Sequence, residues 1–321
     1  MGKEGALRWV RLGRSPVEVP PLAIGCWSWG DSTYWLGETA LDGRDVVAAF
    51  ATAVRTGLTF FDTAESYGWG RSEKLLGALA RRARRPVVIA SKYAPLSGRG
   101  GGAALTAGIE ESLGRLGVAA IDLYQLHWAD REELPIGEAM RVLAEAVRAG
   151  RIRAVGVSNF RAAELSEAHA ALARHGVPLA CQQVEYSLIS RSPEIDGVLE
   201  LCRELEITLL AYSPLAQGLL ADRYSSSKLP PGARGQSPRF RDNLLAAQPL
   251  LDFLRAIASS HDVDPAAVAL AWLLARRDVV PIVGAHSAEQ VASAARALDL
   301  TLSAAEVAKL DELSQPWLRV E

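Results

Sequence analysis

Short runs of apolar residues alternate along this chain with longer stretches whose apolar residues recur at helical spacing. Eight of the short runs predict β-strands, namely Leu22–Cys26, Leu58–Phe61, Val87–Ser91, Ile121–Leu126, Ile152–Val157, Ala180–Glu185, Thr208–Tyr212 and Val279–Val283. The longer stretches predict α-helices, namely Arg44–Thr56, Ser72–Arg82, Ala104–Leu116, Pro135–Ala149, Ala162–His175, Pro193–Leu205, Pro265–Arg276 and Ala288–Leu298. Ahead of them, Arg8–Leu12 and Val17–Val19 flank a group of turn residues, which predicts a small hairpin.

Strands that alternate with helices indicate a parallel sheet, because a parallel return needs a crossover connection. Eight such units close into a (β/α)8 TIM barrel more readily than they spread into an open sheet, so we predict a barrel of the α/β class. An open doubly wound sheet is the alternative, since alternation by itself does not prove closure. Barrels of this length form one domain, and we expect residues 1–321 to do so.

Three connections at the expected C-terminal face of the barrel are longer than usual. Ala216–Asn243 is rich in Ser, Pro, Gly and Arg and is predicted to be an irregular binding loop. Ala94–Gly102 contains four glycines and predicts a second loop on the same face. The segment Gly30–Asp42 after the first barrel strand is expected to form part of a pocket wall.

Composition excludes several classes of partner. The net charge is −2, so nothing attracts nucleic acid or an anionic membrane over long range, and we expect neither as a partner. No apolar run approaches the roughly 20 residues of a membrane span. The three cysteines, Cys26, Cys181 and Cys202, form no metal or redox motif, so no metal is expected and a reducing cytoplasm is the simplest location.

Four polar residues stand at or just beyond the ends of successive predicted strands: Asp62, Tyr67, Lys92 and His127. In α/β barrels the chemistry lies at this end of the strands. A buried Lys92 would need a carboxylate partner, and Asp62 is one strand away. We expect Lys92 to lower the pKa of Tyr67, which starts near about 10, so that Tyr67 protonates a carbonyl oxygen. His127 would donate to the same oxygen.

Taken singly, these residues also have structural interpretations. Asp62 is a residue type common at turns, Tyr67 is then a packing residue, and a lone His at a strand end is often structural. The four residue types together favour the chemical interpretation. They indicate a carbonyl reductase.

Beyond these four residues, the chain resembles the aldo-keto reductase superfamily over nearly its full length. The segments that carry the resemblance are Gly25-Cys26-Trp27, Phe61-Asp62-Thr63-Ala64-Glu65-Ser66-Tyr67-Gly68, Ser91-Lys92, Leu126-His127, Gly156-Val157-Ser158-Asn159-Phe160, Gln183-Val184-Glu185-Tyr186-Ser187, Ala211-Tyr212-Ser213-Pro214-Leu215 and Ile282-Val283-Gly284-Ala285. The resemblance implies an eight-stranded barrel and a catalytic tetrad of Asp62, Tyr67, Lys92 and His127, with Tyr67 as the proton donor. It also implies a nicotinamide dinucleotide bound without a G-x-G-x-x-G fingerprint, which this chain lacks.

The resemblance further implies a cofactor site along the strand ends. Ser158, Asn159 and Gln183 would bind the carboxamide, and Tyr212 would stack on the nicotinamide ring, although a core aromatic is the alternative for Tyr212. The other residues assigned to the cofactor are Gly25, Trp27, Asp62, Ser213, Pro214, Leu215, Gln217, Gly218, Leu220, Gly284, His286, Ser287 and Gln290. Of these, Gln217, Gly218 and Leu220 match the pyrophosphate end. Gly284, His286, Ser287 and Gln290 match the adenosine phosphate, beside a helix N-terminus that favours phosphate.

Two positions depart from the family pattern at the adenosine end. His286 stands where the family commonly has Arg, Lys, Ser or Thr, and Ala294 stands where it commonly has Asn. A neutral His is a weaker partner for a 2′-phosphate than Arg. We therefore expect NADPH as the cofactor with NADH as the alternative, and Arg296 is a candidate for a compensating cation.

Aromatic residues are frequent near the ends of the predicted strands. Trp27, Trp35, Tyr67, Tyr93, His127 and Trp128 are the expected substrate-binding residues. They would form a pocket for an apolar or flat carbonyl compound that excludes water, while some of them would only close the barrel mouth. The resulting hypothesis is an NAD(P)H-dependent reductase of aldehydes or ketones. The alternatives are a cofactor-binding regulatory protein of the same fold, like the potassium-channel β-subunits, and a barrel hydrolase or isomerase, for which we find neither paired carboxylates nor a metal cluster. The oligomeric state is not predicted.

Overall fold

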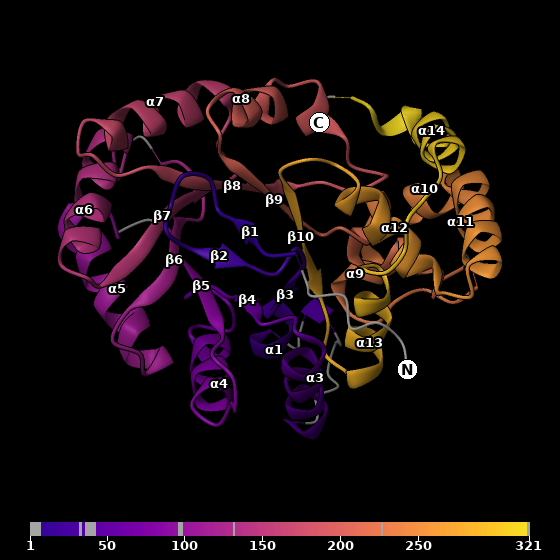
Figure 1. Cartoon of the computed structure of the whole chain (residues 1–321), viewed down its shortest axis with the longest axis horizontal. Coiled ribbons are helices and arrows are strands. Elements are labelled where there is room, and N and C mark those ends of the chain that lie inside the picture. The colour runs from indigo at the N-terminus through magenta and orange to yellow at the C-terminus, as the bar shows by residue number, and fades with distance from the viewer. Residues whose placement is uncertain are drawn as a thin grey trace.

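The computed structural model describes residues 8–31, 34–35, 43–95, 99–130, 132–225 and 227–319. Eight parallel strands form a closed barrel whose strand order follows the sequence, and the last strand pairs with the first. The strands are β3 (Ala23–Gly25), β4 (Phe60–Asp62), β5 (Val88–Tyr93), β6 (Ile121–Leu126), β7 (Ile152–Ser158), β8 (Leu179–Glu185), β9 (Thr208–Tyr212) and β10 (Val279–Gly284). Closure confirms the (β/α)8 barrel and rules out the open doubly wound sheet (Figure 1).

Helices surround the barrel and bury one apolar face against it. The α-helices are α1 (Trp27–Gly30), α3 (Gly43–Thr56), α4 (Arg71–Ala80), α5 (Gly101–Leu116), α6 (Ile136–Arg148), α7 (Ala162–Ala173), α8 (Val198–Glu204), α9 (Ala233–Gln236), α10 (Pro238–Ala246), α11 (Gln248–Ser260), α12 (Pro265–Leu274), α13 (Ala288–Arg296) and α14 (Ala304–Leu313). In Figure 1, α11 and α14 lie outside the ring of helices, beyond α12, with which α11 is in contact. No helix in the described ranges is long and apolar enough to cross a membrane.

A two-stranded hairpin covers the N-terminal end of the barrel. Strands β1 (Val10–Arg11) and β2 (Glu18–Val19) pair antiparallel, as the sequence predicts. Leu12 and Val17 pack with Phe60 and Leu123 in an apolar cluster inside the barrel. The hairpin therefore closes the end of the barrel at which the strands begin, and their C-terminal ends remain for the site.

The connections at the C-terminal face are more ordered than the sequence suggests. The predicted irregular stretch Ala216–Asn243 contains the 3-10 helix η2 (Ala216–Ala221), α9 and the first part of α10. Short helices fit there because Ser237 accepts a hydrogen bond from the Phe240 backbone and Pro238 begins α10, a combination that starts a helix. Parts of the two other expected loops, residues 32–33, 36–42 and 96–98, lie outside the described residues.

Candidate active site

A cavity of about 550 Å³ opens at the C-terminal ends of the barrel strands. Most of the residues expected at a cofactor or reaction site line it: Gly25, Trp27, Trp35, Asp62, Tyr67, His127, Ser158, Asn159, Gln183, Tyr212, Ser213, Pro214, Leu215, Gln217, Gly218, Gly284, His286 and Gln290. These residues come from segments far apart in the sequence. They meet because parallel strands bring all their carboxyl ends to one face of a barrel.

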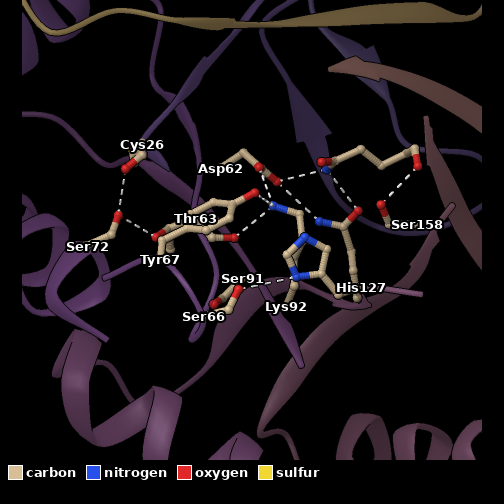
Figure 2. Close-up of polar contacts among 12 residues, drawn as sticks. Cys26, Asp62, Thr63, Ser66, Tyr67, Ser72, Ser91, Lys92, His127 and Ser158 are labelled. Carbon is tan, nitrogen blue, oxygen red and sulfur yellow. Dashed lines mark hydrogen bonds and ion pairs between the residues drawn. The ribbon is translucent and has the colours of Figure 1, made fainter. Parts of the chain in front are cut away.

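Asp62, Tyr67 and Lys92 are in direct contact at one end of this cavity (Figure 2). The Lys92 ammonium is completely buried and donates to Asp62 Oδ1, to the Thr63 carbonyl oxygen at 2.9 Å and to the Tyr67 hydroxyl at 3.3 Å. The His127 ring lies edge-on to the Tyr67 ring, with 5.8 Å between ring centroids. The four residues predicted from separate strand ends therefore form one cluster.

The Tyr67 hydroxyl is the group that the cluster surrounds. Tyr67 lines the cavity, and its hydroxyl lies beside the buried ion pair. Burial raises the pKa of Tyr67 above its ordinary value, the Lys92 ammonium opposes that rise, and Asp62 adds to it. The expectation that Lys92 brings this pKa below the ordinary value is therefore wrong for the net shift. Removing a phenol from water costs more than one neighbouring cation returns when that cation is already paired with a carboxylate.

Lys92 is positively charged in this setting, whereas His127 is neutral. Burial lowers the pKa of Lys92, but Asp62 and Tyr67 raise it more, so the ammonium stays charged. Burial, together with the Lys92 charge, lowers the pKa of His127 to about 3, so its ring is neutral at physiological pH. His127 Nδ1 lies 3.5 Å from Ser66 Oγ. A neutral imidazole can donate one hydrogen bond without adding a second positive charge beside Lys92.

Close backbone packing sets the position of Tyr67. Gly68 has φ +59°, and a Cβ there would lie 2.1 Å from the carbonyl oxygen of Gly30. Only glycine fits both the left-handed backbone and this approach. Ser72 adds a bridge, since its hydroxyl lies 2.7 Å from Thr63 Oγ1 and donates to the Cys26 carbonyl oxygen at 2.8 Å. These contacts fasten the loop that carries Tyr67 to the ends of β3 and β4.

A chain of hydrogen bonds joins the amide-bearing residues on the next strands. Asn159 Nδ2 donates to Ser158 Oγ at 3.1 Å and to the His127 carbonyl oxygen at 2.9 Å. The Tyr212 hydroxyl donates to Asn159 Oδ1 at 3.1 Å, and Ser158 Oγ donates to the Gln183 carbonyl oxygen at 3.0 Å. Asn159 and Ser213 have φ values of +58° and +50°, a left-handed backbone that turns the chain out of the strand toward the cavity.

Aromatic rings form the wall on the side of β3. The Trp27 ring stacks on Tyr34 with 4.8 Å between centroids, meets Trp35 edge-on at 5.1 Å and faces Tyr67 at 6.0 Å. Trp128 lies against the His127 ring, with 4.8 Å between centroids, and is not among the cavity-lining residues. A flat, apolar surface therefore leads to the Tyr67 hydroxyl.

Besides Trp128, four of the residues singled out in the sequence are not among the cavity-lining residues. Tyr93 is fully buried in the helix layer and its hydroxyl donates to the Arg99 carbonyl oxygen at 2.5 Å, so it is not in a position to bind substrate. Its side chain points out of the barrel because residues alternate along a strand and Lys92, its neighbour, points in. Leu220 is fully buried, Ser287 caps α13 by accepting from the Gln290 backbone, and Arg296 donates to the Asp262 carbonyl oxygen.

The far end of the cavity contains cations that the sequence did not single out. Arg223, Tyr224 and Arg234 line the cavity, as do Ser28 and Ser293. Burial lowers the pKa of His286, and the charges of Arg223 and Arg234 lower it further, while Asp45 opposes them. The only available signal was the arginine content of the stretch after β9, because a loop has no periodicity that assigns a residue to a site. Arg223 and Arg234, rather than Arg296, are the cations at this end.

Several polar atoms of the cavity lining have no partner among the described residues. Ser28 Oγ, Trp35 Nε1 and Arg234 Nε are buried and unpaired, although buried donors are normally hydrogen-bonded. They are hydroxyl and nitrogen donors, and the Arg234 guanidinium lies over the Trp35 ring, 4.7 Å from its centroid, which fits a ligand that carries phosphates and hydroxyl groups. In the described part of the chain, no cluster of His, Cys, Asp or Glu is arranged to hold a metal ion.

Comparisons with known proteins show the family of this chain. The sequence model of the aldo/keto reductase family matches residues 21–315. The chain is 35% identical over 315 residues to the chloroplastic pyridoxal reductase of Arabidopsis thaliana, which covers 94% of this chain and 85% of that protein. It is 30% identical over 330 residues to the NADH-specific methylglyoxal reductase of Escherichia coli, covering 96% and 99% of the two chains. Its fold is similar to the crystal structure of an aldo-keto reductase from Klebsiella pneumoniae in complex with NADPH, with a TM-score of 0.75, 33% identity and coverage of 97% and 96%.

Proposed function

This chain belongs to the aldo/keto reductase family, and we propose that it reduces an aldehyde to an alcohol with Tyr67 as the proton donor. The chain is an NAD(P)H-dependent oxidoreductase, as its reductase relatives and its NADPH-bound structural neighbour indicate. The observation that carries the assignment of Tyr67 is the position of its hydroxyl. Tyr67 lines the cavity, and its hydroxyl lies 3.3 Å from the Lys92 ammonium.

When bound, the reduced nicotinamide supplies the hydride that the carbonyl carbon accepts. Ser158, Asn159 and Gln183 would hold its carboxamide, and Tyr212 would flank the ring. The phosphates would lie at the end lined by Arg223, Arg234 and His286. NADPH is the preferred cofactor because Arg223 is exposed on the cavity lining and can pair with an additional phosphate. NADH stays the alternative, since one of the relatives is NADH-specific.

The proton comes from Tyr67. Its raised pKa keeps the phenol protonated at neutral pH, so the proton is present when a carbonyl arrives. The Lys92 ammonium stabilises the phenolate that remains after the proton leaves, and it can do so without rearranging because Asp62 and the Thr63 carbonyl already hold it in place. His127, as a neutral donor, would direct the carbonyl oxygen toward the Tyr67 hydroxyl.

The aromatic wall indicates the substrate class. Trp27, Trp35 and Tyr67 offer flat apolar faces on the path to the hydroxyl. Such a wall favours a planar or aromatic aldehyde and displaces water from the carbonyl during reduction. The two relatives named above are named as reductases of pyridoxal and of methylglyoxal, and both compounds contain an aldehyde group. Of these two substrates, the aromatic one matches the wall better.

The test is turnover of an aromatic aldehyde. Purified protein is mixed with NADPH and 4-nitrobenzaldehyde, and the loss of cofactor absorbance is followed for the wild type and for Tyr67→Phe. We expect Tyr67→Phe to reduce kcat by at least about 100-fold, the usual contribution of a general acid. Tyr93→Phe is the matched control, because it removes a phenol buried away from the cavity. Equal rates for wild type and Tyr67→Phe would remove Tyr67 from this role, and cofactor binding without turnover of any carbonyl would favour a regulatory protein.

A further inference from the structure

One buried side chain beside the tetrad has no place in the proposed mechanism. Gln125, on β6, is fully buried, is not among the cavity-lining residues and contacts Asp62. Its Nε2 donates to Asp62 Oδ2 at 3.2 Å. Its Oε1 accepts from Gln183 Nε2 at 3.2 Å and from the Cys181 thiol at 3.6 Å. A buried amide with this many partners has a fixed orientation.

Asp62 determines which way both glutamine amides point. Its Oδ1 accepts from Lys92, and its Oδ2 accepts from the Nε2 atoms of Gln125 and Gln183, the latter at 3.0 Å. An ionised carboxylate only accepts hydrogen bonds, so the nitrogen of each amide must face it. The Gln125 oxygen is then left to accept the second hydrogen of Gln183 Nε2. Neither amide can be reversed without placing an oxygen against the carboxylate.

This arrangement leaves one polar atom of Gln183 for the cavity. Both Nε2 hydrogens are used inside the barrel, and Oε1 has no hydrogen-bond partner among the described residues. Gln183 itself lines the cavity. The site therefore presents an acceptor at this point, which suits an NH2 group and repels another acceptor.

A glycine makes room for this network. Gly156 on β7 pairs with Gln125 on β6 and with Cys181 on β8. A Cβ at Gly156 would lie 2.4 Å from Cys181 Sγ and 2.9 Å from Gln125 Cγ. The backbone conformation of Gly156 is ordinary, so the reason for glycine here is space. Its missing side chain lets groups on β6 and β8 meet across β7.

We propose that Gln125 is a positioning residue that fixes the Gln183 amide with its oxygen toward the amino group of the nicotinamide carboxamide. This inference rests on the proposed function, because it concerns how the cofactor is held. Without Gln125, the Gln183 amide loses the acceptor for its second hydrogen and is held only by its hydrogen bond to Asp62. The preference of the site for a carboxamide over groups of similar size that lack an NH2 would then be weaker.

Three oxidised cofactors test the orientation in the wild type. NADP+ has a carboxamide, its 3-acetylpyridine analogue has a methyl group in place of the NH2, and nicotinic acid adenine dinucleotide phosphate has a carboxylate. Titration calorimetry should give NADP+ a Kd at least about tenfold lower than that of either analogue. The acetylpyridine analogue lacks the NH2 that donates to Gln183 Oε1, and the carboxylate analogue places an acceptor against that oxygen. Equal or tighter binding of the carboxylate analogue would mean that Gln183 presents its NH2, and would overturn the inference.

Gln125→Met tests the positioning residue itself. Methionine fills a similar volume but keeps none of the hydrogen bonds of the Gln125 amide. We expect this variant to bind NADP+ about tenfold more weakly, while its affinity for the acetylpyridine analogue changes by less than about twofold. The matched control is Gln182→Met. Gln182 is equally buried on the same strand as Gln183, donates to the Phe160 carbonyl oxygen and does not touch Asp62. The Gln182→Met variant should keep the wild-type preference for NADP+ over the acetylpyridine analogue.

Other results would separate the failure of this inference from failure of the proposed function. A Gln125→Met protein that keeps the wild-type preference, or a Gln182→Met protein that loses it equally, would overturn the role of Gln125 while aldehyde reduction by the wild type still stands. A wild type that neither binds NADP+ nor oxidises NADPH in the presence of an aldehyde would overturn both. If Gln125→Met does not fold, Gln125→Asn shortens the amide by one methylene and should lose the same preference.

Discussion

The two ends of the cavity are built differently. At the Tyr67 end, Lys92, Asp62 and Thr63 already hold one another through hydrogen bonds among themselves. At the end lined by Arg223, Arg234 and His286, the buried Arg234 Nε has no hydrogen-bond partner in the part of the chain that the structure describes, and Arg223 is exposed. One end is complete before any ligand arrives, and the other is completed by the ligand.

This difference matches what each end has to do. A proton donor and its cation must be in position at the moment of reaction, so their orientation is fixed by the protein in advance. Phosphates bring their own charge and acceptor atoms, so donors that wait for them are satisfied on binding. The loop after β9 also ties the two sides together, because Arg234 donates to the carbonyl oxygens of Gln217 at 2.7 Å and Trp35 at 2.9 Å.

The largest effect should come from removing the Lys92 cation at the Tyr67 end of the cavity. Lys92→Met leaves the Asp62 carboxylate buried without its ion-pair partner, and we expect a loss of about 3–5 kcal/mol in the free energy of unfolding. Catalysis should fall by at least about 100-fold. Urea denaturation and steady-state rates measure both.

Arg151→Met is the control for this experiment, since it breaks the exposed Arg151–Glu110 pair and should cost less than about 1 kcal/mol. If Lys92→Met were no less stable than Arg151→Met, the buried ion pair would not be what organises this end.

The second prediction concerns the backbone that places Tyr67. Gly68→Ala forces a Cβ into a left-handed residue and against the Gly30 carbonyl oxygen, so we expect a loss of about 2 kcal/mol in stability and a lower kcat. Gly114→Ala is the matched control. Gly114 lies within α5 with nothing close to its added Cβ, and this change should stabilise the protein by roughly 0.5–1 kcal/mol. Equal stabilities of the two variants would contradict the account of Gly68.

The third prediction addresses the other end of the cavity. Arg223→Gln should raise the Kd for NADPH by about tenfold, because one charge-assisted contact to phosphate is lost, and should change the Kd for NADH less. Titration of both cofactors gives the ratio. Arg277→Gln, at the opposite end of the barrel before β10, is the control and should change neither. A uniform weakening of both cofactors would place Arg223 at the pyrophosphate, and no weakening would remove it from the site.

The smallest expected effect is on the pH dependence of stability. The pKa of His127 is about 3 in the folded protein and near its ordinary value of about 6.5 in the unfolded chain. The unfolded state then binds more protons in acid. The contribution of His127 to the free energy of unfolding is therefore complete above about pH 6.5 and is lost as the pH falls toward 3. Between roughly pH 7 and 5.5 it amounts to about 1 kcal/mol. His127→Gln should flatten the acid side of the stability profile by that amount, and an unchanged slope would contradict a neutral His127.

The same contrast explains how far the sequence could be interpreted. The eight barrel strands were predicted within a few residues, and Asp62, Lys92 and His127 could be placed together because a strand end has a defined position in a barrel. Arg223 and Arg234 were missed because they lie in a segment without hydrophobic periodicity. Helices α11 and α14 were also missed. They pack outside the ring of barrel helices, so the alternation of strands and helices that predicts the barrel does not predict them.

Errors of a second kind concerned the surroundings of a side chain rather than the topology of the fold. Tyr93 shares a strand with Lys92, but the alternation of side chains along β5 turns it away from the cavity. The net pKa shift of Tyr67 depends on how completely its hydroxyl is buried, which no sequence pattern records. In both cases the residue was correctly placed along the chain, and only its surroundings were unknown.

The central claim is that the cavity has a fixed direction, with the nicotinamide at the Tyr67 end and the phosphates at the Arg223 end. A crystal structure of the complex with NADP+ tests it directly. The account predicts the nicotinamide ring beside Tyr67 and Tyr212, its carboxamide on Asn159 and Gln183, and its phosphates near Arg223, Arg234 and His286. Phosphates bound beside Tyr67 and Lys92, or a ring held away from the Tyr67 hydroxyl, would contradict it.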